Sequence, residues 1–437
     1  MYLLYSALLA AGLLVTLPYW LWQMSRHGKY HAGLAQRLGR TPQRLTSPPG
    51  RPVIWVHAVS VGEVLAVSAL VPELCLRFPQ HRVVVSTTTD TGQQLAVKHF
   101  GEDNVFYFPL DFGFAIGPYL RLLHPELIVI AETEFWPNFL RLAHATGARI
   151  AVVNARISDR SFPRYRRWRF LLAGVLRVVD LFLAQTEEDA LRLRAIGAPS
   201  ERVHVSGNLK FDLPPPAMPP IVASLRTALG DAGPVVVCGS TVEGEEPLLL
   251  RAFAEILASD PQAVMILAPR RPERFMEVTR LLESLGIRFW KRSLWDGDAL
   301  AGGVLLVDTI GELAALYSLA DIAFVGGSLV PRGGHNIIEP AQHGVATVVG
   351  RHTENFRDIV RLFQSRDALR VVGPGELSLV IMELISNPAA RADLGRRGAE
   401  TLRSQTGATQ RTADALEALL KPESSWPPVG KGARATP

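Results

Sequence analysis

Two acidic positions in the first half of the chain follow apolar runs, where a carboxylate could carry out acid–base chemistry. Ser60, Gly62 and Glu63 come directly after the run VIWVHAV, and Glu132 comes directly after LIVIA. A carboxylate in a partly desolvated cleft has a shifted pKa and can accept the proton of a hydroxyl group. We predict that Glu63 is a general base and that Glu132 points toward the same cleft. The alternative for Glu63 is helix capping, because acids favour helix N-termini.

Glycines and polar residues gather after the apolar run IAFV in the second half of the chain. Gly333, Gly334, His335 and Asn336 form a loop that should open into a helix at about Asn336, and Glu339 follows within one helical turn. Glycines allow close backbone approach, and a helix N-terminus offers free N–H groups to an anion. We predict that this loop binds a nucleotide phosphate and that Glu339 accepts hydrogen bonds from a ribose. A purely structural glycine turn is the alternative.

Cationic and hydroxyl side chains follow two further apolar runs of the same half. Arg270, Arg271 and Arg274 come after AVMILA, and Ser240 and Thr241 come after VVVCG. Because the guanidinium fork matches phosphate oxygens, these arginines are predicted to bind the same nucleotide, with the hydroxyls contributing to the pocket. A solvated basic turn remains the alternative.

The segment FPRYRRWRF mixes arginines with aromatic residues. Arg164, Arg166 and Arg167 could meet lipid headgroups or acceptor phosphates, since basic and aromatic residues suit a membrane interface. A solvated helix face is the alternative. The acidic pair in DGD at 296–298 is interpreted as a surface turn. We therefore expect no metal or other cofactor. Arg270 and the glycine loop are then expected to stabilise the negative charge of the leaving phosphate.

These positions belong to a regular alternation of short β-branched runs and amphipathic stretches from Pro52 onward. Such an alternation predicts α/β domains, each with a parallel sheet covered by helices. The run FDLPPPAMPP interrupts it, since proline fits neither a helix interior nor a ladder. We predict two Rossmann-like domains facing across a cleft, residues 26–210 and 221–420, joined by a Pro-rich linker over 211–220. Residues 421–437 are predicted to be a disordered tail.

The first 25 residues contain no charged side chain, and Arg26 and Lys29 follow them. About 20 apolar residues can cross a bilayer, and positive residues after the run favour the cytoplasm for the rest of the chain. We predict an N-terminal membrane-anchor helix over residues 1–25 that either spans the membrane or lies in its interface. A buried core helix is the third alternative.

Composition excludes several classes of protein. The 437 residues carry a formal net charge of +5 and include two cysteines, Cys75 and Cys238, both in apolar stretches that we expect in the core. A disulfide framework is therefore excluded, and a reducing compartment is favoured. No helix-turn-helix, zinc-finger or RNA-binding signature is present, so nucleic acid is not an expected partner.

Nine runs between about Tyr30 and Asp358 are characteristic when taken in order. They are HAVSVGE, STTTDTG, ETEFWPN, NARISDRS, QTEEDALRLRAIGA, GNLKFD, GSTVEGEE, PRRPERF and GGSLVPRGGHNIIEP. In this order the chain resembles the Kdo (3-deoxy-D-manno-octulosonic acid) transferases, which implies a glycosyltransferase of the GT-B fold. The resemblance also implies that Glu63 is the catalytic base and that Glu132 is a second essential carboxylate on the acceptor side.

The resemblance further implies that Arg270, Gly334, Asn336 and Glu339 hold the CMP part of the donor. Arg271 stands where relatives carry His, which would alter phosphate contacts without abolishing them. The implied reaction transfers Kdo from CMP-Kdo to a lipid A precursor (lipid IVA), with inversion, at the cytoplasmic face of an inner membrane that contains anionic phospholipid. Two alternatives stay open: a GT-B transferase that uses a UDP-sugar on another lipid, and a non-catalytic protein that binds nucleotides or glycolipids.

Overall fold

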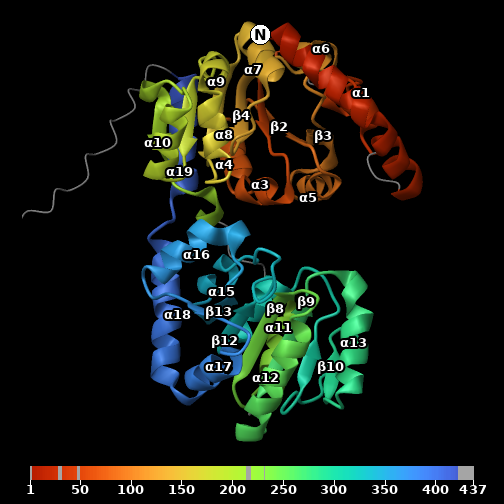
Figure 1. Ribbon diagram of the computed structural model, residues 1–437, viewed down its shortest axis with the longest axis vertical. Helices are drawn as coiled ribbons and strands as arrows, with labels where there is room; N and C mark the ends of the chain where they lie inside the picture. The colour runs from red at the N-terminus through yellow and green to blue at the C-terminus, as the bar shows by residue number, and fades with distance from the viewer. Residues whose placement is uncertain (1, 28–31, 47–49, 213–217, 231, 422–437) are drawn as a thin grey trace, which may run out of the picture. The chain divides into compact units, whose positions relative to one another are not determined.

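The computed structural model describes residues 2–27, 32–46, 50–212, 218–230 and 232–421, which form helices and two sheets (Figure 1). The chain divides into two compact units. The first consists of Met1–Pro214 together with Gln405–Pro437, and the second is Pro215–Ser404. Each unit is built around one sheet with helices on both faces, so the predicted α/β class with parallel sheets is confirmed.

The sheet of the first unit has seven parallel strands in the order β3-β2-β1-β4-β5-β6-β7. The strands are β1 (Val53–His57), β2 (Arg82–Thr87), β3 (Val105–Tyr107), β4 (Pro125–Ala131), β5 (Arg149–Ala155), β6 (Leu181–Ala184) and β7 (Val203–Val205). Every residue of β1 is buried, because helices cover both faces of a parallel sheet. Val56 of β1 pairs with Val85 on one side and with Val129 on the other.

Helices of the first unit cover this sheet on two sides, each with its own core. The helices are α1 (Tyr2–His27), α2 (Leu34–Arg37), η1 (Gln43–Leu45), α3 (Val61–Ala66), α4 (Leu70–Arg77), α5 (Asp90–Phe100), η2 (Glu102–Asn104), α6 (Gly113–Leu123), α7 (Pro137–Ala145), α8 (Phe162–Arg167), α9 (Arg169–Leu176), α10 (Glu187–Ala195), η3 (Ser200–Arg202), η4 (Leu209–Asp212) and α19 (Ala408–Leu420). Neighbouring strand residues point to opposite faces. Accordingly, Trp55 joins the core with Phe106 and Phe139, whereas Ile54 joins the core with Leu70.

The last helix, α19, returns to the first unit (Figure 1). Its buried residue Leu416 belongs to the same core cluster as Leu70 of α4. Nη1 of Arg77 lies 2.6 Å from Oδ1 of Asp414 and 3.2 Å from Oε2 of Glu417. The predicted second domain, which ran to residue 420, is therefore too long at its end, because the apolar face of α19 completes the first core.

The sheet of the second unit also has seven parallel strands, in the order β10-β11-β9-β8-β12-β13-β14. The strands are β8 (Val235–Thr241), β9 (Val264–Pro269), β10 (Phe289–Lys291), β11 (Val304–Leu306), β12 (Ile322–Val325), β13 (Ala346–Gly350) and β14 (Arg370–Val372). The helices are α11 (Pro220–Ala228), α12 (Glu246–Ser259), η5 (Pro272–Arg274), α13 (Phe275–Ser284), α14 (Leu313–Leu316), η6 (Tyr317–Leu319), α15 (Ile338–Gln342), η7 (Glu354–Phe356), α16 (Arg357–Gln364), α17 (Leu377–Ser386) and α18 (Pro388–Arg403).

The N-terminal apolar segment forms α1, which docks on the first unit along one side. Nδ2 of Asn138 in α7 donates a 3.0 Å hydrogen bond to Oγ of Ser6, and the Arg141 guanidinium lies 5.0 Å from the ring centre of Tyr2. Leu3 is 89% exposed, so α1 is not a buried core helix. Within the described ranges, no helix combines the length and the apolar character needed to cross a bilayer. The expected membrane-spanning anchor is therefore not supported.

Three smaller expectations have mixed outcomes. Phe211 is buried and belongs to η4, so the start of the predicted linker 211–220 is part of the first unit. Positions 213–217 of that linker and 422–437 of the predicted tail lie outside the described residues. Cys238 is buried as expected, whereas Cys75 is exposed on α4, so its assignment to the core is wrong.

Candidate active site

Each sheet reverses its strand order beside the first strand of its unit. The reversal lies between β1 and β4 in the first sheet and between β8 and β12 in the second. Open parallel sheets bind ligands outside the carboxyl ends of their strands at such a reversal. Glu63 and Glu132 follow β1 and β4, whereas Thr241 ends β8 and His335 follows β12. The sequence-predicted residues therefore lie at the reversal point of each unit.

Glu63 lies in the first turn of α3 and is held by the residues before the helix. Its Oε2 accepts a 2.8 Å hydrogen bond from the Val59 N–H, and its Oε1 accepts a 2.9 Å hydrogen bond from the Ser60 hydroxyl. The Glu63 side chain is buried, with 7% of the residue exposed. Gly62, one position earlier, has only the Ser60 hydroxyl near the place where a Cβ would stand.

Burial raises the pKa of Glu63 to about 7, and the carboxylates of Glu132 and Glu134 add to this effect against the two hydrogen bonds. A base with a pKa near the working pH is well matched to proton transfer. Helix capping and base chemistry are therefore compatible at Glu63, since the capping contacts orient the carboxylate and still leave acceptor sites on both oxygens.

Glu132 stands in the turn that follows β4 and has an unusual backbone. Its φ of 56° lies in the left-handed region, where a non-glycine residue is strained and often functional. Its Oε1 lies 3.0 Å from Nζ of Lys210, which η4 brings to this point. Because β4 ends at Ala131, strand alternation no longer decides the directions of Glu132 and Glu134. Both carboxylates lie near enough to Glu63 to raise its pKa.

Lys210 is a functional candidate that the sequence prediction did not single out. It belongs to the run GNLKFD, which was noted only as one of the ordered runs. The signal available in the sequence was a lysine in the segment that follows the short strand β7, in the same unit as Glu132 and Glu134, which follow β4. The ion pair with Glu132 became visible only from the fold, because the two residues are 78 positions apart.

The second unit contains a pocket of about 470 Å³ at the carboxyl edge of its sheet. The lining residues include four arginines from two loops and polar residues from a third: Thr241, Val242, Glu243, Arg270, Arg271, Arg274, Arg332 and His335. Five of these residues were predicted to bind the donor, and the structure brings them together: Thr241, Arg270, Arg271, Arg274 and His335. Four cationic side chains in one hollow make it suited to an anionic ligand.

The four arginines of this pocket differ in their partners. Nη2 of Arg274 lies 3.0 Å from the buried Glu246 carboxylate, and Nη1 lies 2.7 Å from Glu277. Over the described part of the chain, Arg270, Arg271 and Arg332 form no ion pair with an acidic side chain, and all three are exposed. The last three therefore carry the cationic charge that is free for a ligand.

His335 is held close to Arg270 as a neutral imidazole. Burial, with Arg270 as a second cause, lowers the pKa of His335 to about 4. Its Nε2 is buried and has no hydrogen-bond partner among the described residues. An unpartnered buried polar atom at the edge of a pocket is costly unless a ligand or water satisfies it.

The glycine loop is shaped by close contacts. Gly334 donates a 2.7 Å hydrogen bond to the Gly327 carbonyl, and a Cβ on Gly333 would come within 2.4 Å of Asn355. Both Gly333 and Gly334 have positive φ, so the two predicted glycines are required by backbone conformation. Asn336 donates a 3.2 Å hydrogen bond from Nδ2 to Oε1 of Glu339.

The helix of the predicted donor site is shorter than expected. The helix expected to open at about Asn336 begins at Ile338 and has five residues, so its dipole is too short to provide the anion site. The arginines carry the positive charge instead. The hydroxyls are also less available than expected, because Thr241 donates its hydroxyl to Oε1 of Glu246 at 3.2 Å. Ser240, Asn336 and Glu339 lie beside the pocket and do not line it.

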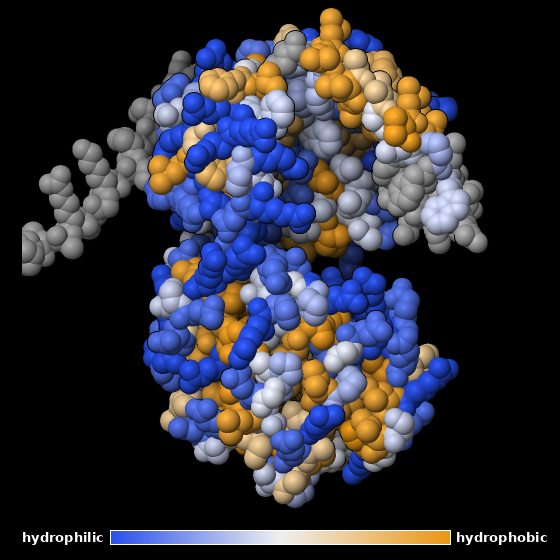
Figure 2. All heavy atoms as spheres, viewed as in Figure 1, coloured by the Kyte–Doolittle hydropathy of each residue, from blue (hydrophilic) through white to orange (hydrophobic). Residues whose placement is uncertain are grey.

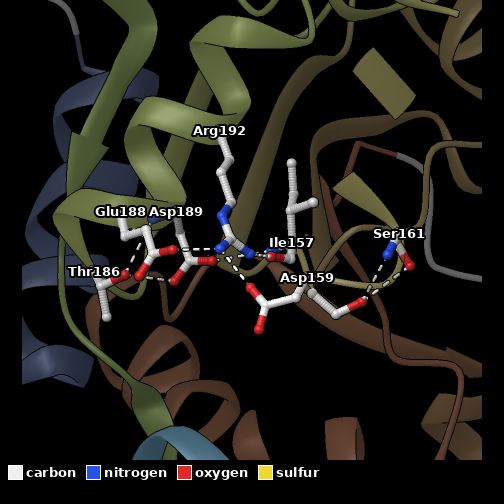
Figure 3. A network of polar contacts seen from close by, with 8 residues as sticks. Ile157, Asp159, Ser161, Thr186, Glu188, Asp189 and Arg192 are labelled. Carbon is white, nitrogen blue, oxygen red and sulfur yellow. Dashed lines mark hydrogen bonds and ion pairs between the residues drawn. The ribbon is translucent and has the colours of Figure 1, made fainter. Parts of the chain in front are cut away.

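The arginines of α8 form a separate basic surface on the first unit. Arg166 and Arg167 line a shallow hollow with Phe162 and Pro163, and Arg164 lies 5.7 Å from the ring centre of Tyr165. The loop before α8 is locked by a polar network, shown in Figure 3, in which Arg192 of α10 is central.

In this network Arg192 donates to the Ile157 carbonyl at 2.6 Å and to Asp159 at 2.5 Å, and it also pairs with Glu188 (Figure 3). Asp189 accepts hydrogen bonds from the Ile157 N–H and from the Thr186 hydroxyl, which also caps α10. Two of the ordered sequence runs, NARISDRS and QTEEDALRLRAIGA, therefore have a structural role: they fix the approach to α8.

The DGD sequence at 296–298 behaves as a surface turn, as predicted. Asp298 accepts hydrogen bonds from the indole groups of Trp290 and Trp295. In the described ranges, no group of three or more His, Cys, Asp or Glu side chains could hold a metal ion.

Relatives of this chain are found among known proteins. A family model described as 3-deoxy-D-manno-octulosonic-acid transferase (kdotransferase) matches residues 32–213. The 3-deoxy-D-manno-octulosonic acid transferase of Haemophilus influenzae is 35% identical over 90% of this chain and 92% of its own length. The enzyme of the same name from Bordetella pertussis is 35% identical over 94% of this chain and 97% of its own.

A solved structure supports the fold. The UDP-GlcNAc 2-epimerase of Neisseria meningitidis, bound to UDP-GlcNAc, aligns with a TM-score of 0.55 over 85% of this chain and 100% of its own, at 16% identity. At that identity the likeness bears on the fold alone, which is of the GT-B type. Function is indicated by the closer sequence relatives, together with the carboxylates at one reversal point and the arginines at the other. The chain belongs to the 3-deoxy-D-manno-octulosonic acid transferase family.

Proposed function

We propose that this Kdo glycosyltransferase uses CMP-Kdo as its donor and a lipid A precursor as its acceptor, and that it inverts the anomeric carbon. The observation that carries the proposal is the Glu63 carboxylate, buried at the first reversal point, with its pKa raised to about 7. A group of this kind can take the proton of a sugar hydroxyl at neutral pH.

The proposed step is a single displacement. The acceptor O–H gives its proton to Glu63, the acceptor oxygen bonds to the anomeric carbon, and the bond from that carbon to the phosphate oxygen breaks to release CMP. Direct attack by the acceptor predicts inversion, because the base acts on the nucleophile and no covalent sugar–enzyme intermediate forms. The pocket arginines, Arg270 above all, would stabilise the negative charge on the departing phosphate in place of a metal ion.

The donor assignment is supported by charge and by size. The second-unit pocket has a volume of about 470 Å³, within the range typical of small-molecule sites. Its free arginines suit the phosphate of a nucleotide sugar. A UDP-sugar would also satisfy the phosphate contacts, so competition of CMP and UDP against CMP-Kdo separates the two donor classes.

Membrane association is proposed for the first unit, at the cytoplasmic face of the inner membrane. Apolar side chains gather on α1 (Figure 2), where Leu3, Leu8 and Val15 are exposed. A helix that exposes apolar side chains in this way can lie in the interface of a bilayer. Arg166 and Arg167, with their exposed neighbour Trp168, would contact anionic phospholipid or the acceptor phosphates.

The test is incubation of the detergent-solubilised protein with CMP-Kdo and tetra-acylated lipid A precursor, followed by mass spectrometry of the lipid. A mass gain of one or more Kdo residues, with the anomeric configuration read by NMR, is the expected result. The Glu63→Gln protein serves as the matched control for background transfer. A folded protein that binds CMP but transfers nothing would point to a different acceptor or to the non-catalytic alternative.

A further inference from the structure

The free cations of the second-unit pocket come from two separate loops. Arg270 and Arg271 follow β9, whereas Arg332 lies in the loop between β12 and α15. In the sheet, β8 separates β9 from β12. Neighbouring strands lie about 4.8 Å apart, so the two loops begin about 10 Å from each other. Arginine side chains from both sides can therefore converge over the end of β8.

Hydrogen bonds hold the backbone at Arg332, whereas its side chain forms no ion pair within the described residues. Nδ2 of Asn355 donates to the Arg332 carbonyl at 3.2 Å, and the Asn355 N–H donates to the Gly333 carbonyl at 2.9 Å. The Gly333–Gly334 corner that follows is itself tied to Gly327. The guanidinium of Arg332 thus projects into the pocket from a fixed base, without an acidic partner in the described part of the chain.

The charges of the proposed donor explain why arginines from two loops would be useful for binding it. In a CMP-linked 2-ulosonic acid, the anomeric carbon carries both the phosphodiester and the sugar carboxylate. The ligand therefore has two negative groups a few ångströms apart, each suited to a guanidinium fork. Glu243 is the carboxylate of the pocket itself, so a phosphodiester would bring the negative charges to two against three free arginines, whereas a donor that also carries a carboxylate balances them.

We infer that Arg332 binds the carboxylate of the donor sugar and so selects an acidic sugar, while Arg270 and Arg271 face the phosphate. This inference rests on the proposed donor, and it adds a specificity-determining residue to that site. His335, which follows Arg332 in the same loop and interacts electrostatically with Arg270, is neutral and adds no third cation between the two sides.

The experiment compares two ligands that differ by one carboxylate. Cytidine 5′-phosphate methyl ester has the single phosphodiester charge and no carboxylate, whereas CMP-Kdo has both. The dissociation constant of the methyl ester is measured by isothermal titration, and kcat/KM is measured for CMP-Kdo at saturating acceptor. Each is determined for the wild type, Arg332→Gln, Arg332→Lys and, as an exposed arginine on α13 outside the pocket, Arg280→Gln.

The expected result is selective. Arg332→Gln should lower kcat/KM for CMP-Kdo about 10- to 100-fold, the effect of losing a charge-assisted hydrogen-bonded pair, and should leave methyl ester binding within about twofold. Arg332→Lys should recover part of the loss, because it keeps the charge without the fork. Arg280→Gln should behave as wild type.

Equal weakening of both ligands would assign Arg332 to the phosphate and overturn the inference, as would unchanged kinetics in Arg332→Gln. Failure of the proposed function looks different. In that case the folded wild-type protein itself would neither bind the methyl ester nor turn over CMP-Kdo. Glu243→Gln gives an independent check, since removal of this exposed carboxylate from the pocket should raise the affinity for the doubly charged donor more than for the methyl ester.

Discussion

Nζ of Lys210 lies 3.0 Å from Oε1 of Glu132, which joins η4 to the turn after β4. Both side chains are partly buried, so the pair is screened less than a surface ion pair. The pair offsets a charge that would otherwise act more strongly on Glu63, whose pKa Glu132 raises. Lys210 therefore helps to determine the pH range in which Glu63 is a base.

Removal of Lys210 should shift the pH dependence of catalysis. In Lys210→Met the Glu132 carboxylate is unpaired, so its charge should raise the pKa of Glu63 further and move the acidic limb of the kcat/KM profile to higher pH. Lys210→Arg keeps the charge and should keep the limb near its original position. The profiles of the three proteins with CMP-Kdo provide the measurement. An unmoved limb in Lys210→Met, together with a normal melting temperature, would count against this role.

The activity of the wild type should fall on the acid side of about pH 7. Glu63 must be deprotonated to act as a base, and burial has raised its pKa to about 7, so protonation below that pH removes the active form. At and above about pH 7, Glu63→Gln should lose about 100- to 10,000-fold in kcat relative to wild type. The exposed Glu102 offers a matched control, since Glu102→Gln should keep both the rate and the profile. Retained activity in Glu63→Gln would remove Glu63 from the base role.

The raised pKa of Glu63 also predicts that the stability of the folded protein depends on pH. Because the pKa of Glu63 is raised from its usual value of 4.5 to about 7 in the folded protein, its ionisation opposes folding. The destabilisation is absent below pH 4.5, grows as the pH rises and is complete above about pH 7, where it amounts to about 3 kcal/mol. Relative to wild type, Glu63→Gln should therefore gain stability between pH 5 and pH 8. Melting temperatures across this range, with Glu102→Gln as the control, test the sign.

Chelation should leave the activity unchanged. We attribute the stabilisation of the leaving phosphate to guanidinium groups, which EDTA does not affect. Arg270→Gln should instead lower kcat/KM for CMP-Kdo and weaken the binding of CMP, each about 10- to 100-fold. A large loss of activity in EDTA that Mg²⁺ or Mn²⁺ restores would contradict this assignment.

Much of the fold could be predicted from the sequence, because parallel strands buried on both faces appear as nearly continuous apolar runs. Runs such as VIWVH and VMILAP therefore marked individual strands. The position of α19 could not be predicted in this way. Its amphipathic pattern indicates a helix with a buried face, but only the three-dimensional structure shows that this face contacts α4, more than 300 positions away.

The candidate site was predictable where function follows from a strand end. Glu63 and Arg270 directly follow strands, and parallel topology brings strand ends to one edge. The roles of Lys210 and Arg332 could not be predicted from their positions in the sequence. They depend on whether each cation forms an ion pair in the folded protein. At α15 the sequence suggested more than the structure contains. The glycine-rich run indicated a helix terminus, whereas the helix Ile338–Gln342 has only about one and a half turns.

Gly333→Ala should damage the donor pocket through two separable effects. A Cβ at this position would lie 2.4 Å from Nδ2 of Asn355, and the φ of 87° is unfavourable for alanine. Gly147 shares the second effect alone, since its φ is 85° and nothing lies within 4 Å of its added Cβ. Gly147→Ala should therefore cost about 1–2 kcal/mol in unfolding free energy and leave donor kinetics intact. Gly333→Ala should cost at least as much and also raise the KM for CMP-Kdo, because displacement of Asn355 releases the backbone of Arg332. Chemical denaturation and steady-state kinetics on both variants separate the backbone strain from the steric collision with Asn355. Equal KM values for CMP-Kdo in the two variants would show that the Asn355 contact does not shape the pocket.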